Sequence, residues 1–522
     1  MTPVSGTLDS LSFEALSPVA FLERSARVFP DRLAVVSDGL RFTYAEHWDR
    51  AQRQAGLWHS VGIRPGDRVA VLSPNTHVLL ESHVGVPLAG GVLVALNTRL
   101  KPGEIAGILE HSGARVLLVD GELESVARKA TAAMVPRVLV IVAGEDYEER
   151  LMRSSAVRVH LEDERALLAI NYTSGTTGSP KGVMYHHRGA YLQALAMALH
   201  ARLDLDSRYL WTLPMFHTNG WCFPWAVTAA GGVHVCLRRP DADAVWHAIA
   251  EEGVTHLCAA PTVLSSMEAH PGRPTHAPRE ILAMTGGAPP TPSLLERFDD
   301  LGVRIVHLYG LTETFGPAVI SEWFSEWEDL PAPERAVLRA RQGVQNVVSQ
   351  RVRVVAADGT DVPADGLTQG EIAMRGNNVM LGYYNDPQAT AAAAPDGWFR
   401  TGDIGVLHPR GVVEIRDRVK DVIISGGENI ASVEVERALA THPAILEVAV
   451  VGRPDEKWGE VPVGYVTVRE GFDVGEAELI AHVRGLLANF KAPKSITFGD
   501  LPHTSTGKIQ KNLLRESTIT VE

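Results

Sequence analysis

The stretch YTSGTTGSPKG, from Tyr172 to Gly182, gathers hydroxyl groups, glycines and a lysine within eleven residues. Glycines let backbone N–H groups approach an anion, hydroxyls donate hydrogen bonds and a lysine adds a point charge, so the stretch predicts a phosphate-binding loop. It is not the Walker A pattern, because counting from Gly175 places Pro180 where the second glycine should stand. We therefore expect ATP to be used in some way other than transfer of its γ-phosphoryl group.

Around this loop, apolar runs alternate with helical patterns. The strand pattern ALLAINYT (166–173) precedes the loop and the helical pattern GAYLQALAMALHA (189–201) follows it. Other strand patterns lie at 67–74, 114–120, 137–144, 255–261 and 303–310. This alternation is typical of parallel sheets with helices on both faces. We predict an α/β fold in which a large N-terminal body of several subdomains contains parallel-rich sheets.

The pattern changes after residues 414–430. Two strand patterns, a helix and a polar tail follow, at 446–454, 463–468, 476–490 and 503–515. They predict a small, mobile α+β domain at the C-terminus. We place a large domain at 1–417, a hinge at 418–420 and the small domain at 421–522. No Gly/Ser-rich linker marks the junction, which favours a short hinge over a flexible tether.

Composition excludes several classes of protein. The 522 residues are enough for more than one domain, and no apolar run approaches the 18 residues of a membrane span. A net charge of −13 argues against nucleic acid as a partner. Three widely spaced cysteines form no metal or disulfide framework, which fits a reducing cytoplasm. No signal peptide is indicated, so we expect a cytoplasmic protein, for which a homodimer is a further expectation.

Chemistry-bearing residues gather at five places. They are the phosphate loop, PMFHTNGW (214–221), YGLTET (309–314), GWFRTGDIG (397–405) and TSTGKIQK (504–511). Taken singly, His217 could be a core histidine, Asp403 a turn former and Lys508 a surface charge. Lysine is scarce, however, since only nine of the 49 basic residues are lysines, and Lys181 and Lys508 both lie in these segments.

Taken together, the five segments resemble those of the adenylate-forming superfamily, which includes acyl-CoA synthetases, adenylation domains of nonribosomal synthetases and luciferases. The resemblance covers essentially the entire chain, and YTSGTTGSPKG and LPHTSTGKIQK are its most specific parts. It implies a two-step reaction with ATP and Mg²⁺. A carboxylate attacks the α-phosphate to give an acyl-adenylate and pyrophosphate, and a nucleophile then displaces AMP.

The resemblance also implies a role for each matching residue. The loop residues Thr173, Ser174, Gly175, Thr176, Thr177, Gly178 and Lys181 would hold the phosphates. Thr177 and Glu313 would be associated with Mg²⁺, and Thr312 would contact the α-phosphate. Tyr309 would stack on adenine, beside Gly310 and the segment Gly286, Gly287 and Ala288. Asp403 and Arg418 would bind the ribose hydroxyls. His217, Trp221 and Gly310 would line the acyl pocket, and His217 would also belong to the catalytic residues, with Lys508, Glu313 and Thr312.

Two features of the C-terminal part would drive the reaction. Carboxylate and α-phosphate repel each other by roughly 4 kcal/mol at 4 Å and an effective dielectric of 20, and Lys508 would offset this repulsion. In the superfamily the small domain rotates between the two steps about a pivot that matches Lys420. Many acyl-CoA synthetases have aspartate there, whereas the luciferase and coumarate-ligase branch has lysine. Rotation would bring Gly426 and Gly427 toward the acyl site.

The segments at 214–225 and 309–317 are most similar to those of synthetases for short- to medium-chain or aromatic carboxylates. Coenzyme A is the expected acceptor, and an amine, as in an amide ligase, is the alternative. Two other classes remain: a phosphotransferase, which would release ADP, and a nucleotide-binding protein without catalysis. The intact segments around Glu313 and Lys508 argue against the second of these. The acid itself cannot be named from the residues.

Overall fold

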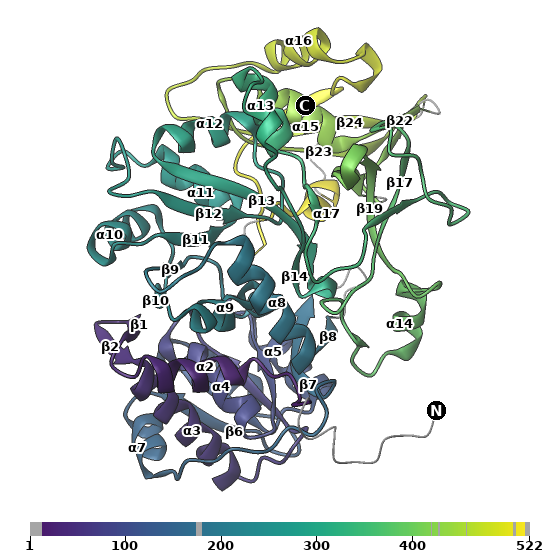
Figure 1. The fold of residues 1–522 in the computed structure, drawn as a ribbon. Helices are drawn as coiled ribbons and strands as arrows, with labels where there is room; N and C mark the ends of the chain where they lie inside the picture. The colour runs from purple at the N-terminus through teal and green to yellow at the C-terminus, as the bar shows by residue number, and fades with distance from the viewer. Residues whose placement is uncertain are drawn as a thin grey trace, which may run out of the picture.

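The strand that leads into the phosphate loop lies inside a seven-stranded sheet (Figure 1). The computed structural model describes residues 13–173, 180–418, 420–425, 428–455, 457–504 and 508–516. The sheet runs β18-β8-β7-β4-β3-β5-β6, and its five strands from β7 to β6 are parallel. Its strands are β3 (Arg68–Leu72), β4 (Val92–Ala95), β5 (Val116–Asp120), β6 (Leu139–Ala143), β7 (Leu167–Thr173), β8 (Lys181–His186) and β18 (Gly382–Tyr383).

A nine-stranded sheet forms the second layer of the body, in the order β15-β14-β13-β12-β11-β9-β10-β1-β2. Its six strands from β13 to β1 are parallel, and the three outer strands are antiparallel. The strands are β1 (Leu33–Ser37), β2 (Leu40–Thr43), β9 (Arg208–Trp211), β10 (Val233–Cys236), β11 (His256–Ala259), β12 (Ile281–Thr285), β13 (Val303–Leu311), β14 (Gly316–Ile320) and β15 (Val344–Gln345). All six strand patterns expected in the body are confirmed as β3, β5, β6, β7, β11 and β13.

Helices pack between the two sheets and on their outer faces. One apolar core joins both sheets through α2 (Val19–Val28), α3 (Tyr44–Ser60), α4 (His77–Leu88), α8 (His187–His200) and α9 (Phe223–Ala230). A second core lies under α5 (Pro102–Ser112) and α6 (Glu124–Thr131), and a third under α10 (Ala242–Glu252), α11 (Pro261–Ala269) and α12 (Pro292–Asp300). The predicted α/β class with parallel-rich sheets is therefore confirmed.

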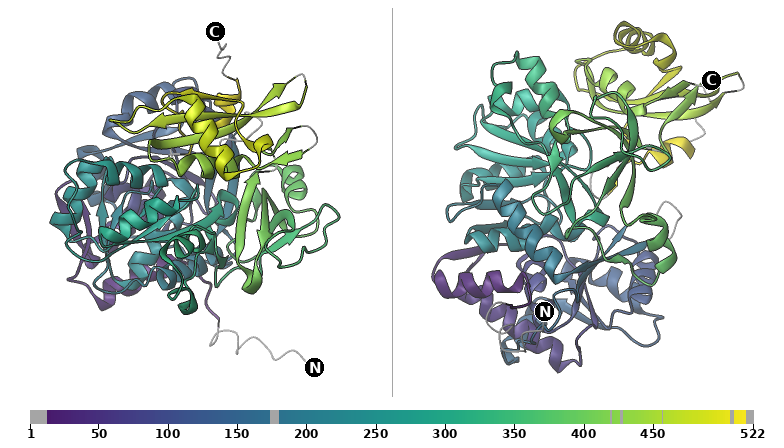
Figure 2. Two further views of the ribbon diagram at one scale, coloured as in Figure 1. Left: turned by 90° about the horizontal axis from the view of Figure 1, so that it is seen from above. Right: turned by 45° about the vertical axis from the view of Figure 1, so that its right-hand side comes forward.

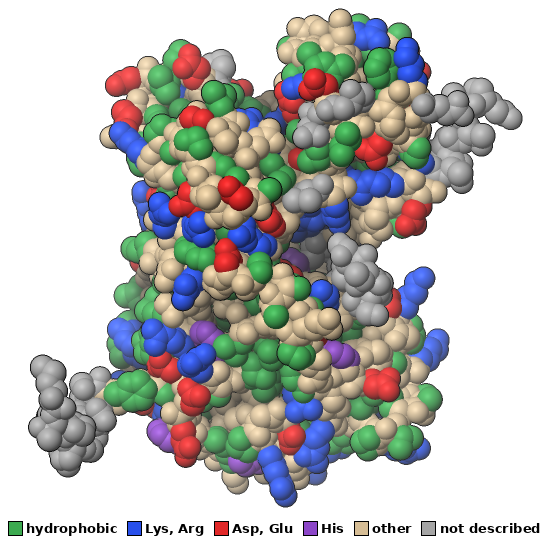
Figure 3. All heavy atoms as spheres, turned by 90° about the vertical axis from the view of Figure 1, so that its right-hand side faces the viewer, with side chains coloured by type: hydrophobic (Ala, Val, Ile, Leu, Met, Phe, Trp, Pro, Cys, Tyr) green, Lys and Arg blue, Asp and Glu red, His purple; other side chains and the backbone are tan. Residues whose placement is uncertain are grey.

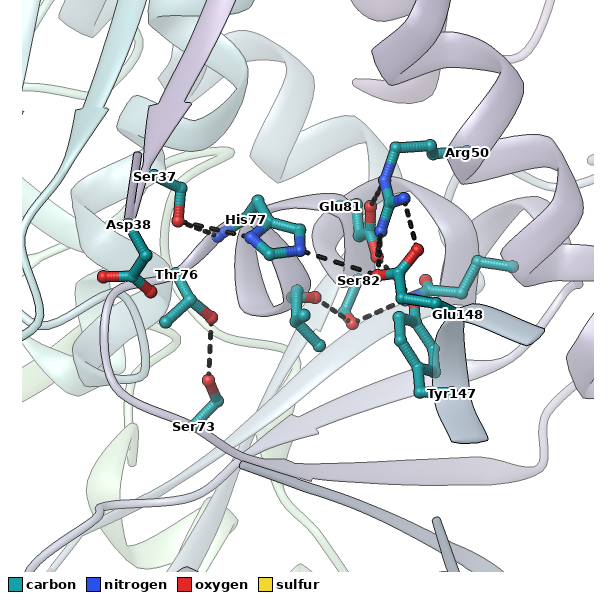
Figure 4. A network of polar contacts seen from close by, with 12 residues as sticks. Ser37, Asp38, Arg50, Ser73, Thr76, His77, Glu81, Ser82, Tyr147 and Glu148 are labelled. Carbon is teal, nitrogen blue, oxygen red and sulfur yellow. Dashed lines mark hydrogen bonds and ion pairs between the residues drawn. The ribbon is translucent and has the colours of Figure 1, made fainter. Parts of the chain in front are cut away.

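A buried ionic network ties three helices of the N-terminal part together (Figure 4). Arg50 on α3 pairs with Glu81 on α4 at 2.8 Å and with Glu148 on α7 (Glu145–Arg153) at 2.7 Å. The Tyr147 hydroxyl donates a further hydrogen bond to Glu81, whose side chain has no exposed surface. Because a buried carboxylate needs such partners, this network fixes how α3, α4 and α7 pack.

A four-stranded antiparallel sheet follows the body. It contains β16 (Arg353–Val355), β17 (Gln369–Met374), β19 (Phe399–Leu407) and β20 (Val413–Arg418). Asp403 on β19 lies opposite Arg418, the last residue of β20. The short helices α13 (Ala332–Arg339) and α14 (Pro387–Ala393) lie in the connections before and within this sheet.

The C-terminal elements form a lobe at one end of the molecule, drawn in yellow and light green (Figures 1 and 2). Its sheet contains β21 (Ile423–Ser425), β22 (Glu428–Ile430), β23 (Ile445–Asp455), β24 (Gly459–Val468) and β25 (Ser495–Phe498). Its helices are α15 (Ser432–Ala440), α16 (Glu476–Leu486) and α17 (Lys511–Glu516). The strand and helix patterns expected here appear as β23, β24 and α16, whereas the boundary at 418–420 stays a prediction.

Ion pairs hold this lobe against the body. Arg437 on α15 lies 3.0 Å from Glu414 on β20, and Arg469 lies 3.6 Å from Glu268 on α11. Seen from the side, acidic and basic side chains are interspersed on the surface, which is hollowed between its upper and lower halves (Figure 3). No helix within the described ranges has the length and apolar character needed to cross a membrane.

Candidate active site

Tyr309, Asp403 and Arg418 meet at the junction between the nine-stranded and four-stranded sheets. The Tyr309 hydroxyl donates a hydrogen bond of 2.6 Å to Asp403, and Arg418 Nε lies 3.2 Å from the other oxygen of the same carboxylate. Burial, and then the negative charge of Asp403, raise the pKa of Tyr309 well above its usual value. The phenol therefore stays a hydrogen-bond donor at neutral pH, and three predicted nucleotide-binding residues form one bonded group.

Glu313 and Lys181 lie on either side of a tyrosine that sequence reasoning did not select. Tyr383 on β18 donates a hydrogen bond of 2.9 Å to Glu313 Oε1, and Lys181 Nζ lies 4.7 Å from the centroid of its ring. Lys181 also pairs with Thr173 across the β7–β8 hairpin that flanks the phosphate loop. The cationic end of the loop and the acidic side chain of the 309–314 segment are thus neighbours.

A second tyrosine holds the turn that carries Thr312 and Glu313. The hydroxyl of Tyr185 on β8 donates a hydrogen bond of 2.6 Å to the backbone oxygen of Thr312. The Tyr185 ring stacks on Phe315, with 3.8 Å between the ring centroids. Phe315 takes a left-handed backbone, with φ of 51°, which reverses the chain from β13 into β14. The side chains of residues 312 and 313 are thereby fixed at the carboxyl end of β13.

The segment around His217 adopts a backbone that few sequences adopt. Five consecutive residues, from Thr218 to Cys222, have positive φ angles between 39° and 66°, and only one of them is glycine. A left-handed backbone costs a non-glycine residue roughly 1–2 kcal/mol, so the surrounding packing must hold this turn in place. Burial, followed by the positive charge of Lys508, lowers the pKa of His217 to about 3. The imidazole is therefore neutral at physiological pH.

This left-handed turn places Trp221 against two glycines, Gly286 just after β12 and Gly316 on β14. A Cβ at Gly286 would lie 3.1 Å from the Trp221 ring, and a Cβ at Gly316 would lie 3.2 Å from Trp221 Cα. Gly310 faces the same strand reversal, where a Cβ would meet the Gly316 oxygen at 2.0 Å. The indole is 8% exposed. Glycine is therefore required at positions 286 and 316, which contact Trp221, and at position 310, which contacts the strand reversal.

Lys508 reaches from the C-terminal lobe into this group. A Cβ at Gly287, whose φ is +92°, would lie 2.9 Å from Lys508 Cε. Burial and the positive charge of Arg418 lower the pKa of Lys508 to about 8, although the carboxylates of Asp403 and Glu313 act in the opposite direction. The ammonium group is thus close to the charges of the site. Within the described ranges no carboxylate forms an ion pair with Lys508, which leaves its charge available for a ligand.

The remaining predicted residues are two exposed side chains and several residues that lie outside the described ranges. Ala288 and Lys420 are exposed. Ser174, Gly175, Thr176, Thr177 and Gly178 lie outside the described residues, as do Gly426 and Gly427.

Sequence reasoning missed Tyr383 and Tyr185. A tyrosine in a short strand is usually a core residue, and neither GYY (382–384) nor VMYHH (183–187) marks its hydroxyl as functional. Only the pairing of β18 with β8, and the two hydrogen bonds to residues 312 and 313, show what the two hydroxyls bind.

Comparison with known proteins identifies the family of this chain. Residues 22–384 match the family described as AMP-binding enzyme, and residues 434–508 match the AMP-binding enzyme C-terminal domain. The chain belongs to the AMP-binding enzyme family. This confirms the resemblance to adenylate-forming enzymes, and within the family the chain is an ATP-dependent acyl-CoA ligase.

Members of this family resemble the chain over nearly its whole length. Acetate–CoA ligase CCL3 of Humulus lupulus is 42% identical and covers 97% of this chain and 95% of its own. The peroxisomal acetate/butyrate–CoA ligase AAE7 of Arabidopsis thaliana is also 42% identical, with coverages of 97% and 95%. Among solved structures, o-succinylbenzoate CoA synthetase of Bacillus subtilis with its acyl-adenylate intermediate has a TM-score of 0.81 and 30% identity, covering 95% of this chain and 98% of its own.

Proposed function

We propose that this acyl-CoA ligase activates a short-chain aliphatic monocarboxylate and that the described cluster performs the first step. The proposal rests on one observation: Lys508 approaches Gly287 beside the hydrogen-bonded group of Tyr309, Asp403 and Arg418. We infer that this cation, which comes from the C-terminal lobe, lies near the point where a nucleotide phosphate and a carboxylate would meet. This placement supports an adenylation site in its working orientation.

In the first step, a carboxylate oxygen forms a bond to the α-phosphorus of ATP and the bond from that phosphorus to the bridging oxygen of pyrophosphate breaks. Lys508 would stabilise the negative charge that develops between the two reactants. Asp403 and Arg418 would bind the ribose hydroxyls, and the Tyr309 ring would lie against adenine. Thr312 would contact the α-phosphate from the turn that Tyr185 holds.

Glu313 fits the Mg²⁺ that such a reaction requires. One of its oxygens accepts the Tyr383 hydroxyl, and no bond to the other oxygen is found within the described part of the chain. Carboxylate oxygens are the protein ligands that Mg²⁺ prefers. The ion would neutralise charge on the departing pyrophosphate, with Glu313 as its protein ligand and Thr177 as the second predicted one.

In the second step, the coenzyme A thiol loses its proton, its sulfur bonds to the acyl carbon, and the bond from that carbon to the AMP oxygen breaks, so that AMP leaves. We propose that residues 418–420 are the hinge between the domains 1–417 and 421–522, with Lys420 as pivot. In support, Arg418 ends the last strand of the four-stranded sheet, and Asp421 N–H bonds to the Arg418 oxygen just before β21 begins. Rotation there would withdraw Lys508 and admit the thiol.

The acid is proposed from the surroundings of Trp221. Its indole fills the space beside Gly286 and Gly316 and is almost completely buried, which favours a short acyl chain. The two relatives described above are named for acetate and butyrate. Aromatic acids, which the sequence left open, are the second candidate, because a rotation of this indole would enlarge the pocket.

Pyrophosphate exchange across a panel of acids tests the proposal. Acetate, propionate, butyrate, 2-methylpropanoate, octanoate, benzoate and cinnamate should be compared at equal concentration, with ATP and Mg²⁺. We expect exchange to be fastest with the short aliphatic acids, and AMP release to be stimulated by coenzyme A. Fast exchange only with aromatic acids would refute the proposal of a short aliphatic substrate. Amide formation from amino acids without thiol stimulation would refute coenzyme A as the acceptor.

Location and assembly are proposed separately. We retain the cytoplasm and a homodimer as proposals, although the Arabidopsis relative is named as peroxisomal. Cell fractionation and light scattering of the purified protein test the two.

A further inference from the structure

The Tyr383 side chain contacts both Lys181, the lysine next to the phosphate loop, and Glu313, the acidic residue of the 309–314 turn. Its hydroxyl lies 2.9 Å from Glu313 Oε1, and Lys181 Nζ lies 4.7 Å from the centre of its ring. The tyrosine is 8% exposed. One end of a single rigid side chain thus contacts the carboxylate, and its ring face contacts the ammonium group.

The backbone around Tyr383 fixes it to both neighbours. On one side, β18 is antiparallel to β8, with Tyr383 opposite Val183 and with Tyr384 N–H bonded to the Gly182 oxygen at 2.7 Å. On the other side, the Met380 N–H donates a hydrogen bond of 2.8 Å to the backbone oxygen of Glu313. The short segment 380–384 therefore links the hairpin that carries the phosphate loop to the turn that carries Glu313.

Both contacts suit their partners chemically. A phenol is protonated at neutral pH, so the Tyr383 hydroxyl, 2.9 Å from Glu313 Oε1, donates to the carboxylate. A hydrogen bond to a charged acceptor stabilises more than a neutral one. The electron-rich ring face attracts the Lys181 ammonium without neutralising it, which leaves its charge for phosphate.

We propose that Tyr383 is a positioning residue that holds Glu313 and Lys181 at a fixed separation, so that both can bind the metal-bound triphosphate at the same time. The inference rests on the proposed roles of Glu313 toward Mg²⁺ and of Lys181 toward phosphate. Tyr383 itself touches neither reacting atom. Its removal acts through the orientation of the Glu313 carboxylate, and its effect therefore depends on the metal.

Tyr383→Phe tests the proposal, because it removes the hydroxyl and keeps the ring beside Lys181. Tyr384→Phe is the matched control. It deletes the same atom from the next residue, whose ring lies instead near His111 and Arg68. Binding of ATP to each full-length protein is measured by calorimetry, once with Mg²⁺ and once with EDTA, and the Mg²⁺ concentration that gives half-maximal pyrophosphate exchange is measured in parallel.

We expect Tyr383→Phe to weaken ATP binding in Mg²⁺ about tenfold or more, the effect of losing one hydrogen bond to a charged group, and to leave binding in EDTA unchanged. The half-maximal Mg²⁺ concentration should rise, and Tyr384→Phe should match the parent in all three measurements. Tyr383→Leu, which also loses the ring, should weaken binding in EDTA as well.

The proposal is overturned if the half-maximal Mg²⁺ concentration of Tyr383→Phe equals that of the parent. It is also overturned if Tyr383→Phe loses the same affinity for ATP with and without Mg²⁺, as a misfolded protein would. A double-mutant cycle adds an independent check, because Tyr383→Phe should cost nothing further in a Glu313→Gln protein. Absence of carboxylate-dependent exchange in the parent protein would instead refute the proposed function, so the two failures are distinguishable.

Discussion

Lys508 crosses Gly287 so closely that a Cβ at position 287 would lie 2.9 Å from Lys508 Cε. The two residues belong to different lobes, and this contact exists only while the C-terminal lobe has its present orientation. Contacts below 3.0 Å force a shift, and the flexible end of the lysine would be the part that moves.

Gly287→Ala should therefore impair adenylation by displacing Lys508. We expect roughly a tenfold loss or more in pyrophosphate exchange, since the preorganised charge moves out of place. Gly39→Ala is the control for backbone strain, because Gly39 has a similar φ of +80° and open space around its Cβ direction. If both substitutions leave exchange unchanged, Lys508 does not need the space above Gly287.

Lys508→Ala should separate the two half-reactions. We expect formation of acyl-adenylate to fall roughly a hundredfold to a thousandfold, the cost typical of one preorganised charge-stabilising group. Acyl-adenylate supplied from outside should still react with coenzyme A, as measured by AMP release. Equal losses in both assays would show that the residue has a structural role or that the lobe does not rotate.

Trp221→Ala should lengthen the range of accepted acids. Removal of the indole from the space beside Gly286 and Gly316 would let each further CH₂ of the acyl chain contribute about 0.8 kcal/mol of binding. The ratio of kcat/KM for octanoate to that for butyrate measures this effect. A ratio that stays at the parent value would place the acyl chain elsewhere.

Acid should destabilise the protein through its buried histidines. Burial lowers the pKa of His47 to about 3, and the pKa values of His83 and His187 to about 4. Below the unfolded value of about 6.5 the unfolded chain binds more protons than the folded one, so the stabilisation present at neutral pH is lost as the pH falls. Each site contributes up to about 1.4 kcal/mol per pH unit to the free energy of unfolding.

Denaturant midpoints at pH 7.5, 6.0 and 5.0 measure this dependence. We expect the midpoint to fall at each step toward acid. Replacement of the exposed His160 by Gln, as a control, should leave the change of the midpoint with pH unaltered. A midpoint constant from pH 7.5 to 5.0 would contradict the neutral, buried state of these histidines.

Arg50→Ala should destabilise the N-terminal part strongly. It would leave the fully buried Glu81 without its ionic partner, and breaking a buried pair in this way costs about 3–5 kcal/mol. The comparison is Arg128→Ala, which removes an exposed pair with Glu124 on α6 and should cost at most about 1 kcal/mol. Thermal unfolding of both variants gives the test, and similar melting temperatures would mean that the network in Figure 4 contributes little.

Local pattern was enough to predict the elements and the class of the fold. Apolar runs such as those of β5 and β13 alternate with helical patterns. A strand that is apolar on both faces must be covered on both faces, and a parallel sheet with helices on each side provides this cover. The C-terminal elements were also recognisable, because their strand and helix periods lie within single short segments. The family was identifiable for a related reason, since its phosphate loop and its C-terminal lysine segment are each contiguous in the chain.

Tertiary structure alone decided how these segments meet. The bonded group of Tyr309, Asp403 and Arg418 joins two sheets, and its hydrogen bonds depend on the register between β19 and β20. Tyr383 acquires its partners only because β18 pairs with β8 next to the end of β13.

The left-handed turn that contains Trp221 could not be predicted from its residues, because Thr218, Trp221 and Cys222 disfavour that backbone and only packing overcomes the cost. The approach of Lys508 to Gly287 likewise joins residues that are far apart in sequence and meet only when the two lobes pack together. Sequence therefore determined which chemical groups are present and which family they form, because those properties are local. Tertiary structure decided their distances and partners, because hydrogen bonds and buried charges act over a few ångströms between residues that only the fold brings together.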